Sequence, residues 1–374
     1  SLQSVPPAVA AHAGLFDPAG AWLITGGFGG FGLACAEWLA AQGAHTLVLV
    51  GRSGADAEAA ERLAALERMG VAVRRVQADI GNAAAVQALC AMVANDKLPL
   101  AGVLHAAGTL ADMAISEMDV ADLQRVMVPK LDGAWHLSEA LESHSLRPRH
   151  FIMFSSIAAT VGNVRQANYA AANVAIDALA AARRARGLPA DCVAWGALSV
   201  GMGVSNVTLA RHFEGMCMQP ISSRVALAGL ERVLAQRPGS VMLAAVDWEQ
   251  WGRFEPTGGR SPRFAHLTGK DATGGESALK IALAAMGIAE REEMAMLMLT
   301  EALSGPLKMA AERIDPERTL SDLGVDSLMA VEVQIAISSV FAVEFSTLEL
   351  MRGNTVSLLA SRVLERMQIA EPTA

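Results

Sequence analysis

The chain of 374 residues contains a single tyrosine, Tyr169, within the alanine-rich stretch NYAAANVAID at 168–177. Packing among alanines does not explain a tyrosine at this position, so we consider a chemical role for its phenol. Asn173 follows Tyr169 by four residues, which places both side chains on one face of a helix, about 6 Å apart along its axis. The sole tyrosine is therefore the first candidate for a catalytic residue.

Cysteines and long apolar runs are also scarce. The four cysteines, Cys35, Cys90, Cys192 and Cys217, are far apart and form no CxxC pair. This spacing excludes a disulfide framework and a cysteine zinc site, and it is typical of buried thiols in a reducing cytosol. No apolar run reaches the roughly 18 residues of a membrane span, and no signal-peptide pattern precedes the first domain. We expect a cytoplasmic protein with no membrane segment and no metal site.

Basic residues are fewer than acidic ones: the chain has 30 Lys and Arg against 38 Asp and Glu, which gives a net charge of −8. Proteins that bind nucleic acids neutralise phosphates with Lys and Arg, so we expect no nucleic-acid partner, while a local phosphate site stays open. With 52% hydrophobic residues, the chain can build a large core. The chain begins at Ser1, which suggests a processed chain or a fragment of a longer one.

The order of apolar segments predicts two domains. Residues 1–20 are rich in Ala and Pro and are interpreted as a linker. Short apolar strands alternate with helical patterns over 21–252, which predicts a Rossmann-type, doubly wound parallel sheet covered on both faces. Gly, Pro, Ser and charged residues dominate 253–277, which predicts a flexible linker. Residues 278–370 have helical spacing only, with helices near 278–287, 291–311, 327–340 and 355–368, and predict a small four-helix bundle.

A glycine-rich stretch, TGGFGGFG at 25–32, follows the first expected strand and opens a helix. Glycines let a backbone approach a pyrophosphate, and the helix N-terminus offers free N–H groups. The alternative is an ordinary tight turn. The predicted cofactor-binding residues here and at later strand ends are Thr25, Gly26, Gly27, Phe28, Gly29, Gly30, Gly32, Arg52, Ser53, Asp79, Ile80, Ala106, Ala107 and Gly108.

The end of the second strand indicates which dinucleotide binds. An NAD site usually has a carboxylate there, but this chain has Arg52 and Ser53. A guanidinium would bind a 2′-phosphate, which favours NADPH, although a solvated loop arginine is the alternative. Asp79 ends the third strand and could accept from the adenine amino group, or could cap the following helix.

The glycine pattern, HAAG at 105–108, and a serine thirteen residues before the tyrosine resemble the short-chain dehydrogenase/reductase superfamily. That family's usual Tyr-x-x-x-Lys is absent, because Asn173 stands at the lysine position and a lysine occurs upstream in VPKLDGAWHL, at Lys130. This exchange resembles the ketoreductase domains of modular polyketide synthases. The similarity extends over 21–252 and includes FSS, QANYAAAN, VAWGA and VDWEQW.

The resemblance implies a role for each of four residues. Tyr169 would protonate a ketone oxygen while hydride arrives from the nicotinamide, and Ser156, rather than Ser155, would hydrogen-bond the same oxygen. A phenol is a weak acid, so Lys130 would supply positive charge, and Asn173 would orient Lys130 or a water. Taken singly, these residues could be a packed aromatic, a strand end and a surface charge.

Stereochemistry leaves a further trace in the stretch TLADMA. In the family, Leu-Asp-Asp after the fourth strand accompanies the D (3R) alcohol, and here Leu110 and Asp112 are present while Ala111 replaces the first aspartate. The opposite class has a Trp eight residues before the tyrosine, where this chain has Val161. The resemblance therefore implies a D-alcohol product. The stretch at 202–220 matches the family's substrate lid, or is ordinary packing.

The second domain contains LGVDSLMAVEV, in which Ser327 opens an amphipathic helix. It resembles the acyl carrier protein motif, whose serine bears 4′-phosphopantetheine, and a helix N-terminus favours the attached phosphate. A bare helix cap is the alternative, since Asp326 and Ser327 are good cap residues.

Together the resemblances imply NADPH-dependent reduction of a β-ketoacyl thioester carried on Ser327. The implied partners are ketosynthase, acyltransferase and dehydratase domains and a phosphopantetheinyl transferase. Three alternatives stay open: a free-standing dehydrogenase, a redox-inactive scaffold with a working carrier domain, and the equivalent region of a fatty acid synthase. These ketoreductases usually have an upstream, cofactor-free subdomain, and only about twenty residues precede the first expected strand here, so we expect that subdomain elsewhere in a longer chain, on another chain, or outside this sequence.

Overall fold

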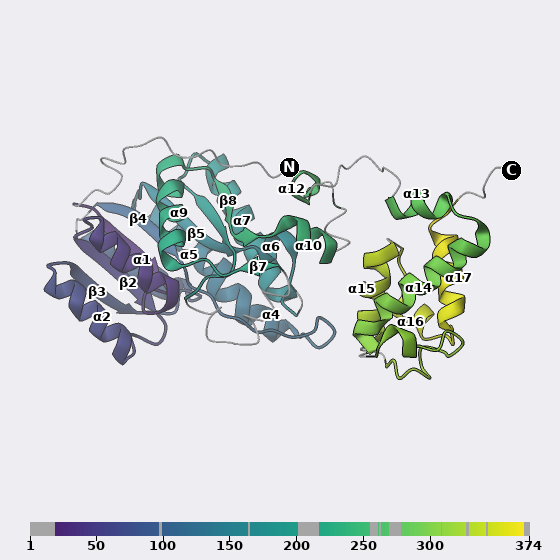
Figure 1. The fold of residues 1–374 in the computed structure, drawn as a ribbon. Coiled ribbons are helices and arrows are strands. Elements are labelled where there is room, and N and C mark those ends of the chain that lie inside the picture. Colours follow the sequence, from purple (N-terminus) through teal and green to yellow (C-terminus); the bar gives the residue numbers. More distant parts are fainter. Residues whose placement is uncertain are drawn as a thin grey trace. The chain divides into compact units, whose positions relative to one another are not determined.

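The computed structural model describes residues 19–96, 99–163, 165–200, 217–254, 261, 263–268, 278–307, 309–326, 329–341 and 343–369. They divide into two compact units, with the boundary between Val246 and Asp247 (Figure 1). The expected linker at 1–20 lies outside the described residues except for its last two positions.

The first unit is built on a seven-stranded sheet in which every paired strand runs parallel. The strand order is β3-β2-β1-β4-β5-β6-β8, which confirms the predicted Rossmann-type fold. The order reverses between β1 and β4, and open α/β sheets bind ligands at the carboxyl ends of the strands beside such a point. The strands are β1 Ala21–Thr25, β2 Thr46–Gly51, β3 Ala72–Gln77, β4 Leu100–His105, β5 His150–Ser156, β6 Asp191–Trp195 and β8 Ser240–Leu243.

Helices cover both faces of this sheet because its central strands are apolar on both sides. In β1, Trp22 and Ile24 enter one core while Ala21 and Leu23 enter the other. The first core is closed by α1 Gly30–Ala41, α2 Ala57–Arg68 and α9 Ser223–Gln236. The second is closed by α3 Ala83–Asn95, α5 Gly133–Ser143 and α7 Ala167–Ala185. The two cores therefore hold the central strands between two layers of helices.

A long helical stretch follows β4, and it is interrupted. It consists of α4 Val120–Met127, a π-helical turn η1 at Val128–Asp132, and α5. Pro129 lies in this turn and has no N–H, so one regular helical hydrogen bond is missing where α4 runs into η1. A short helix, α6 Ala158–Val161, and an antiparallel pair, β7 Met218–Gln219 with β9 Ala245–Val246, complete the unit.

The second unit contains helices, as predicted for 278–370. Its elements are α10 Trp248–Phe254, α12 Ala265–Thr268, α13 Ala278–Ala284, α14 Ile288–Leu307, η2 Ala311–Arg313, α15 Met329–Phe341, α16 Thr347–Leu350 and α17 Val356–Arg366. One core holds α13 to α17 together through Leu299, Val333 and Leu359. This helical region fits a carrier domain.

The expected linker at 253–277 differs in part from the prediction. Helix α12 lies inside it, and Phe264 is buried against Trp248 and Trp251, with ring centroids 5.8 and 5.1 Å away. A single phenylalanine in a Gly- and Pro-rich stretch can bury enough apolar area to order its neighbours. Residues 255–260, 262 and 269–277 of this segment lie outside the described residues.

Candidate active site and carrier site

A pocket of about 550 Å³ opens at the carboxyl ends of β1, β4, β5 and β6. Its lining residues come from seven separate stretches of the sequence, including the end of β2, which supports the expected location of a ligand beside the switch point. The predicted residues that line it are Gly26, Phe28, Gly29, Gly30, Gly32, Arg52, Ser53, Ala106, Ala107, Gly108, Leu110, Lys130, Ser156 and Tyr169. Six predicted residues, Thr25, Gly27, Asp79, Ile80, Asp112 and Asn173, are not among the lining residues.

The glycine turn has the shape that a bound pyrophosphate requires. Gly26 has a φ of +68°, and a Cβ on Gly32 would lie 2.2 Å from the Gly26 carbonyl oxygen, so neither position accepts a side chain easily. A Cβ on Gly29 would meet no atom within 4 Å, so this glycine leaves the pocket side open. No side chain caps the N-terminus of α1, and its N–H groups are left for a ligand. The turn therefore fits a dinucleotide.

At the end of β2, the exposed Arg52 lines the pocket. Asp79 is exposed outside the pocket, and its Oδ1 accepts from the Gly81 amide at 2.9 Å. The cap of α3, one role considered for Asp79, is instead supplied by Asn82, whose Oδ1 accepts from Ala85 at 3.1 Å. Ile80 is buried beneath the site.

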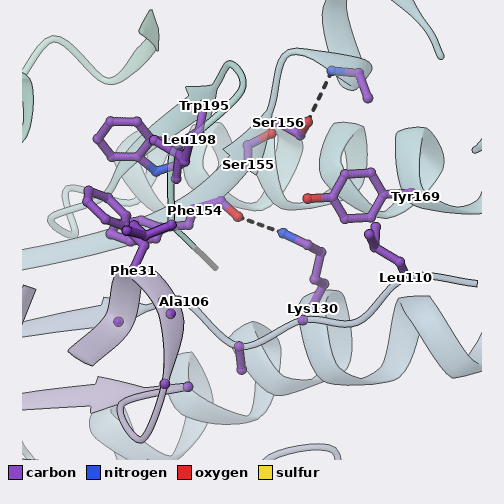
Figure 2. A pocket seen from close by; sticks show the side chains of 18 of the residues that line it. Phe31, Ala106, Leu110, Lys130, Phe154, Ser155, Ser156, Tyr169, Trp195 and Leu198 are labelled. Atoms are coloured by element: carbon purple, nitrogen blue, oxygen red, sulfur yellow. Dashed lines mark hydrogen bonds between the residues drawn. The ribbon is translucent and has the colours of Figure 1, made fainter. Parts of the chain in front are cut away.

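The two serines at the end of β5 have different surroundings. Ser155 is buried, and its hydroxyl donates to the Asn173 carbonyl at 3.3 Å. Ser156 is half-buried, and its hydroxyl accepts from the Ala158 amide at 3.2 Å, which leaves its proton free to bond a ligand. Figure 2 shows the Tyr169 hydroxyl pointing toward this end of β5. This arrangement favours Ser156 over Ser155 as the partner of Tyr169.

Lys130 lies next to Tyr169 although 39 positions separate them in the sequence. The lysine is only 4% exposed, its Nζ donates to the Phe154 carbonyl at 2.8 Å, and that nitrogen is 5.2 Å from the centroid of the Tyr169 ring (Figure 2). A Cβ on Gly108 would be 3.0 Å from the lysine Cε, so this glycine makes room for the lysine stem. A desolvated cation therefore stands beside the only phenol of the chain.

Asn173 is fully buried, and it bonds its own helix. Its Nδ2 donates to the Tyr169 carbonyl at 2.7 Å, and its Oδ1 has no partner among the described residues. The sequence suggested that Asn173 orients either Lys130 or a water. Within the described residues, its amide makes no hydrogen bond to Lys130. The unpaired oxygen suits a bound water, since a buried acceptor without a donor is costly.

Asp177, one turn beyond Asn173, is a neighbour of this site that the sequence did not single out. Burial raises the pKa of its carboxyl, while the neighbouring side chains of Cys192 and Ser155 and the charges of Lys130 and Arg184 act in the opposite direction. The charge on Lys130 therefore has an acidic neighbour inside the protein.

The loop after β4, which carries the predicted Asp112, is fastened to the start of α7 by Gln166 and Asn168, two residues that the sequence did not single out. Both carboxylate oxygens of Asp112 accept from Gln166 Nε2 at 3.1 Å, and Asn168 Nδ2 donates to the Ala111 carbonyl at 2.8 Å. Leu110, on the same loop, faces the Tyr169 ring (Figure 2). The polar residues Gln166 and Asn168 within an alanine-rich motif were the available signal. Residues 201–216, most of the expected lid, lie outside the described residues.

In the second unit, Ser327 and Leu328 lie outside the described residues. Asp326 caps the following helix, since its Oδ1 accepts from Met329 at 2.8 Å and its carbonyl accepts from Ala330 at 2.9 Å. The cap role that could explain the Asp-Ser pair is therefore supplied by Asp326.

Two kinds of feature are missing from the part of the chain that the structure describes. No group of three His, Cys, Asp or Glu side chains is placed to hold a metal ion. None of the helices there combines the length and the apolar character needed to cross a bilayer.

Comparison with known proteins gives two family matches. The KR domain family matches residues 20–200, and the phosphopantetheine attachment site family matches residues 299–363. Among curated relatives, a phenolphthiocerol/phthiocerol polyketide synthase from Mycobacterium tuberculosis is 33% identical over 95% of this chain. The spectinabilin polyketide synthase system protein NorB of Streptomyces orinoci is 36% identical over 89%. This chain spans only 16% and 15% of their lengths.

Solved structures agree with these matches. An A1-type ketoreductase superimposes with a TM-score of 0.62 and 37% identity, over 66% of this chain and 52% of the other. The parallel sheet, the pocket and the two family matches therefore converge, and the chain belongs to the polyketide synthases, with a ketoreductase domain followed by a carrier domain.

Proposed function

We propose that residues 21–252 reduce the β-keto group of an acyl thioester with NADPH. We further propose that Ser327, in a carrier domain at 278–370 joined by the segment 253–277, holds that substrate on a phosphopantetheine arm. The single observation that carries the proposal is the convergence of Tyr169, Ser156 and Lys130 on a pocket beside a glycine turn.

The geometry divides the chemistry among these residues. When bound, the nicotinamide cofactor supplies hydride to the keto carbon. Tyr169 Oη gives a proton to the keto oxygen as its charge develops, and the Ser156 hydroxyl donates a hydrogen bond to that oxygen. The product is a secondary alcohol, and Tyr169 is left as a phenolate. The buried ammonium of Lys130, 5.2 Å from the phenol ring, stabilises that anion.

The position of Arg52 supports NADPH as the form of the cofactor. Its guanidinium stands where an NAD site would have a carboxylate, and its charge and fork geometry suit a 2′-phosphate. The predicted adenine contact of Asp79 has less support, because its carboxylate lies outside the pocket and bonds the Gly81 amide.

The predicted D (3R) product rests on Leu110, Asp112 and Val161. The Asp112–Gln166 contact ties the loop that carries Leu110 to the start of the Tyr169 helix, so this loop can set which face of the ketone meets the cofactor. Chiral analysis of the reduced product is the measurement that decides this assignment.

Partners of the chain follow from the carrier domain and from the relatives. We infer that a phosphopantetheinyl transferase modifies Ser327 and that ketosynthase, acyltransferase and dehydratase domains act on the same arm. The same residues would serve in a fatty acid synthase. A redox-inactive scaffold with a working carrier is disfavoured by the complete set of Tyr169, Ser156 and Lys130 at the pocket.

The test follows absorbance of NADPH with a β-ketoacyl thioester of a short pantetheine mimic. We expect oxidation with wild type, a loss of about 100-fold or more with Tyr169→Phe, and a D-3-hydroxy product. NADH should be used less well than NADPH, and Arg52→Ala should narrow that preference. Equal rates for wild type and Tyr169→Phe would overturn the mechanism, and an L product would overturn the stereochemical assignment.

A further inference from the structure

A buried chain of hydrogen bonds runs beneath the pocket and joins three of its parts. Thr25 Oγ1 lies 2.9 Å from His105 Nδ1, and His105 Nε2 lies 2.9 Å from the Lys130 carbonyl oxygen. Thr25 and His105 are paired residues at the ends of the neighbouring parallel strands β1 and β4, so their side chains lie on the same face of the sheet. Both residues are buried.

The chemistry of the partners fixes the direction of each bond. A carbonyl oxygen only accepts, so His105 Nε2 must carry the proton and donate to Lys130. His105 Nδ1 is then an acceptor and takes the hydroxyl proton of Thr25. The Thr25 oxygen in turn accepts from the Ala107 amide at 3.4 Å. Burial lowers the pKa of His105 to about 4, so the ring is neutral near pH 7 and this single pattern persists.

The acceptor at the end of this chain lies in an unusual stretch of backbone. Lys130 is in the middle of the π-helical turn η1, where the regular helical hydrogen bonds are displaced. The Gly133 amide also bonds the Lys130 carbonyl, and a Cβ on Gly133 would be 2.8 Å from Ile80 Cδ1 and 3.3 Å from His105 Cε1. Glycine at 133 thus lets both Ile80 and the imidazole lie close to the turn.

Lys130 is consequently held at both ends. His105 fixes its backbone carbonyl, the Phe154 carbonyl fixes its ammonium at 2.8 Å, and Gly108 leaves the space through which its stem passes. The ammonium can face the Tyr169 ring only if the backbone of η1 keeps its position. Thr25 begins the glycine turn, so the same series of hydrogen bonds also connects that turn to Lys130.

We propose that His105 is a positioning residue that fixes the catalytic lysine, Lys130, by donating a hydrogen bond to its backbone carbonyl. This inference rests on the proposed function for its kinetic consequences. It does not make His105 an acid or a base, because the imidazole is buried, does not line the pocket, and has both ring nitrogens in hydrogen bonds.

Two polar substitutions of similar size separate the two sides of the imidazole. His105→Gln places an amide nitrogen near the position of Nε2 and keeps the donor to Lys130. His105→Asn is shorter, so it can reach Thr25 but not the Lys130 carbonyl. The matched control is His150→Phe, because His150 is also buried in the sheet but has no hydrogen-bond partner within the described chain.

The kinetic readout is kcat and KM for the thioester together with the pH profile of kcat. We expect His105→Asn to lower kcat by about 10- to 100-fold with little change in KM, and to displace the pH profile. His105→Gln should stay within about threefold of wild type, and His150→Phe should leave kcat unchanged. Equal kcat for the Asn and Gln variants would overturn the inference.

Hydrogen–deuterium exchange of the full chain gives a readout that does not need activity. Amides at 128–133 should exchange faster in His105→Asn than in His105→Gln, while exchange in the distant α2 stays the same. Unchanged exchange at 128–133 in both variants would also overturn the inference. A wild-type chain that reduces no thioester, but shows this difference in exchange, would refute the proposed function and leave the positioning role supported.

Discussion

His150 offers a sharp test of the packing of the first unit, and it does not depend on function. The ring lies at the start of β5, is buried, and stacks on Trp22 with centroids 5.8 Å apart and planes at 11°. Neither ring nitrogen has a hydrogen-bond partner in the part of the chain that the structure describes. Burial, aided by the charges of Arg149 and Arg237, lowers its pKa from 6.5 to about 4. The folded protein therefore resists a protonation that the unfolded chain accepts readily.

The sign of the effect follows from linkage. Between pH 6.5 and 4 the unfolded state binds more protons at this site than the folded state, so the free energy of unfolding falls as pH falls. A lowering from 6.5 to about 4 corresponds to a total of about 3 kcal/mol, of which about 2 kcal/mol accumulates between pH 7 and 4.5. His150→Phe keeps a ring against Trp22 and removes the titrating group. Between pH 7 and 4.5 the free energy of unfolding of this variant should therefore fall by about 2 kcal/mol less than that of wild type.

Urea unfolding followed by tryptophan fluorescence measures this difference. Four of the six tryptophans, Trp22, Trp38, Trp135 and Trp195, lie in the first unit, and none lies in 278–370, so the signal reports mainly on the first unit. At pH 7 the two proteins should have similar midpoints, and at pH 4.5 the variant should unfold at about 1 M higher urea. His105 has a similarly lowered pKa and stays in both proteins, so its contribution cancels in the comparison. Parallel loss of stability in the two proteins would show that His150 is not buried as described.

Two further predictions concern single contacts. Gly108→Ala should lower kcat about tenfold without a large change in melting temperature, because a Cβ 3.0 Å from Lys130 Cε displaces the lysine. Steady-state kinetics checks this, and an unchanged kcat would contradict the proposed packing of the lysine. Arg291→Leu should destabilise the carrier unit by about 2–4 kcal/mol, because the buried guanidinium donates to the carbonyls of Leu283, Ala284 and Met286 at the end of α13. Hydrogen–deuterium exchange of 278–307 in the full chain should rise in this variant but not in the variant of the exposed Arg352, Arg352→Leu. Equal exchange in the two variants would argue against a stabilising role for the hydrogen bonds of Arg291.

The sequence predicted the architecture where its pattern is strong. Each central strand of the sheet is a short apolar run, and residues such as Trp22 and Leu23 pack on opposite faces, so a doubly covered parallel sheet follows from the pattern alone. The short elements were not foreseen. Strand β8 is only partly buried, and β7 and β9 are two residues each, so none has a periodic signal.

The site was predictable in parts for a different reason. Local spacing placed Asn173 on the Tyr169 face, but spacing could not show that its amide bonds the Tyr169 carbonyl. Nothing local in VPKLD places Lys130 at the pocket, and only the resemblance to a family led to it. The partnerships of His105 with Lys130 and of Gln166 with Asp112 join positions that meet only through the strand order, so they became visible once the fold was known.

The phosphopantetheine arm suggests how the two domains act together, and it leads to the most direct measurement. The carrier would be loaded at Ser327 with a β-ketoacyl pantetheine, incubated with NADPH, and analysed by intact-protein mass spectrometry. Reduction adds two hydrogen atoms to the acyl group, a gain of about 2 Da. The proposed function predicts this gain with wild type and its loss with Tyr169→Phe, with loading at Ser327 unchanged in both. A loaded wild-type chain that stays at its original mass in NADPH would contradict the central claim that this pocket reduces the substrate that its own carrier presents.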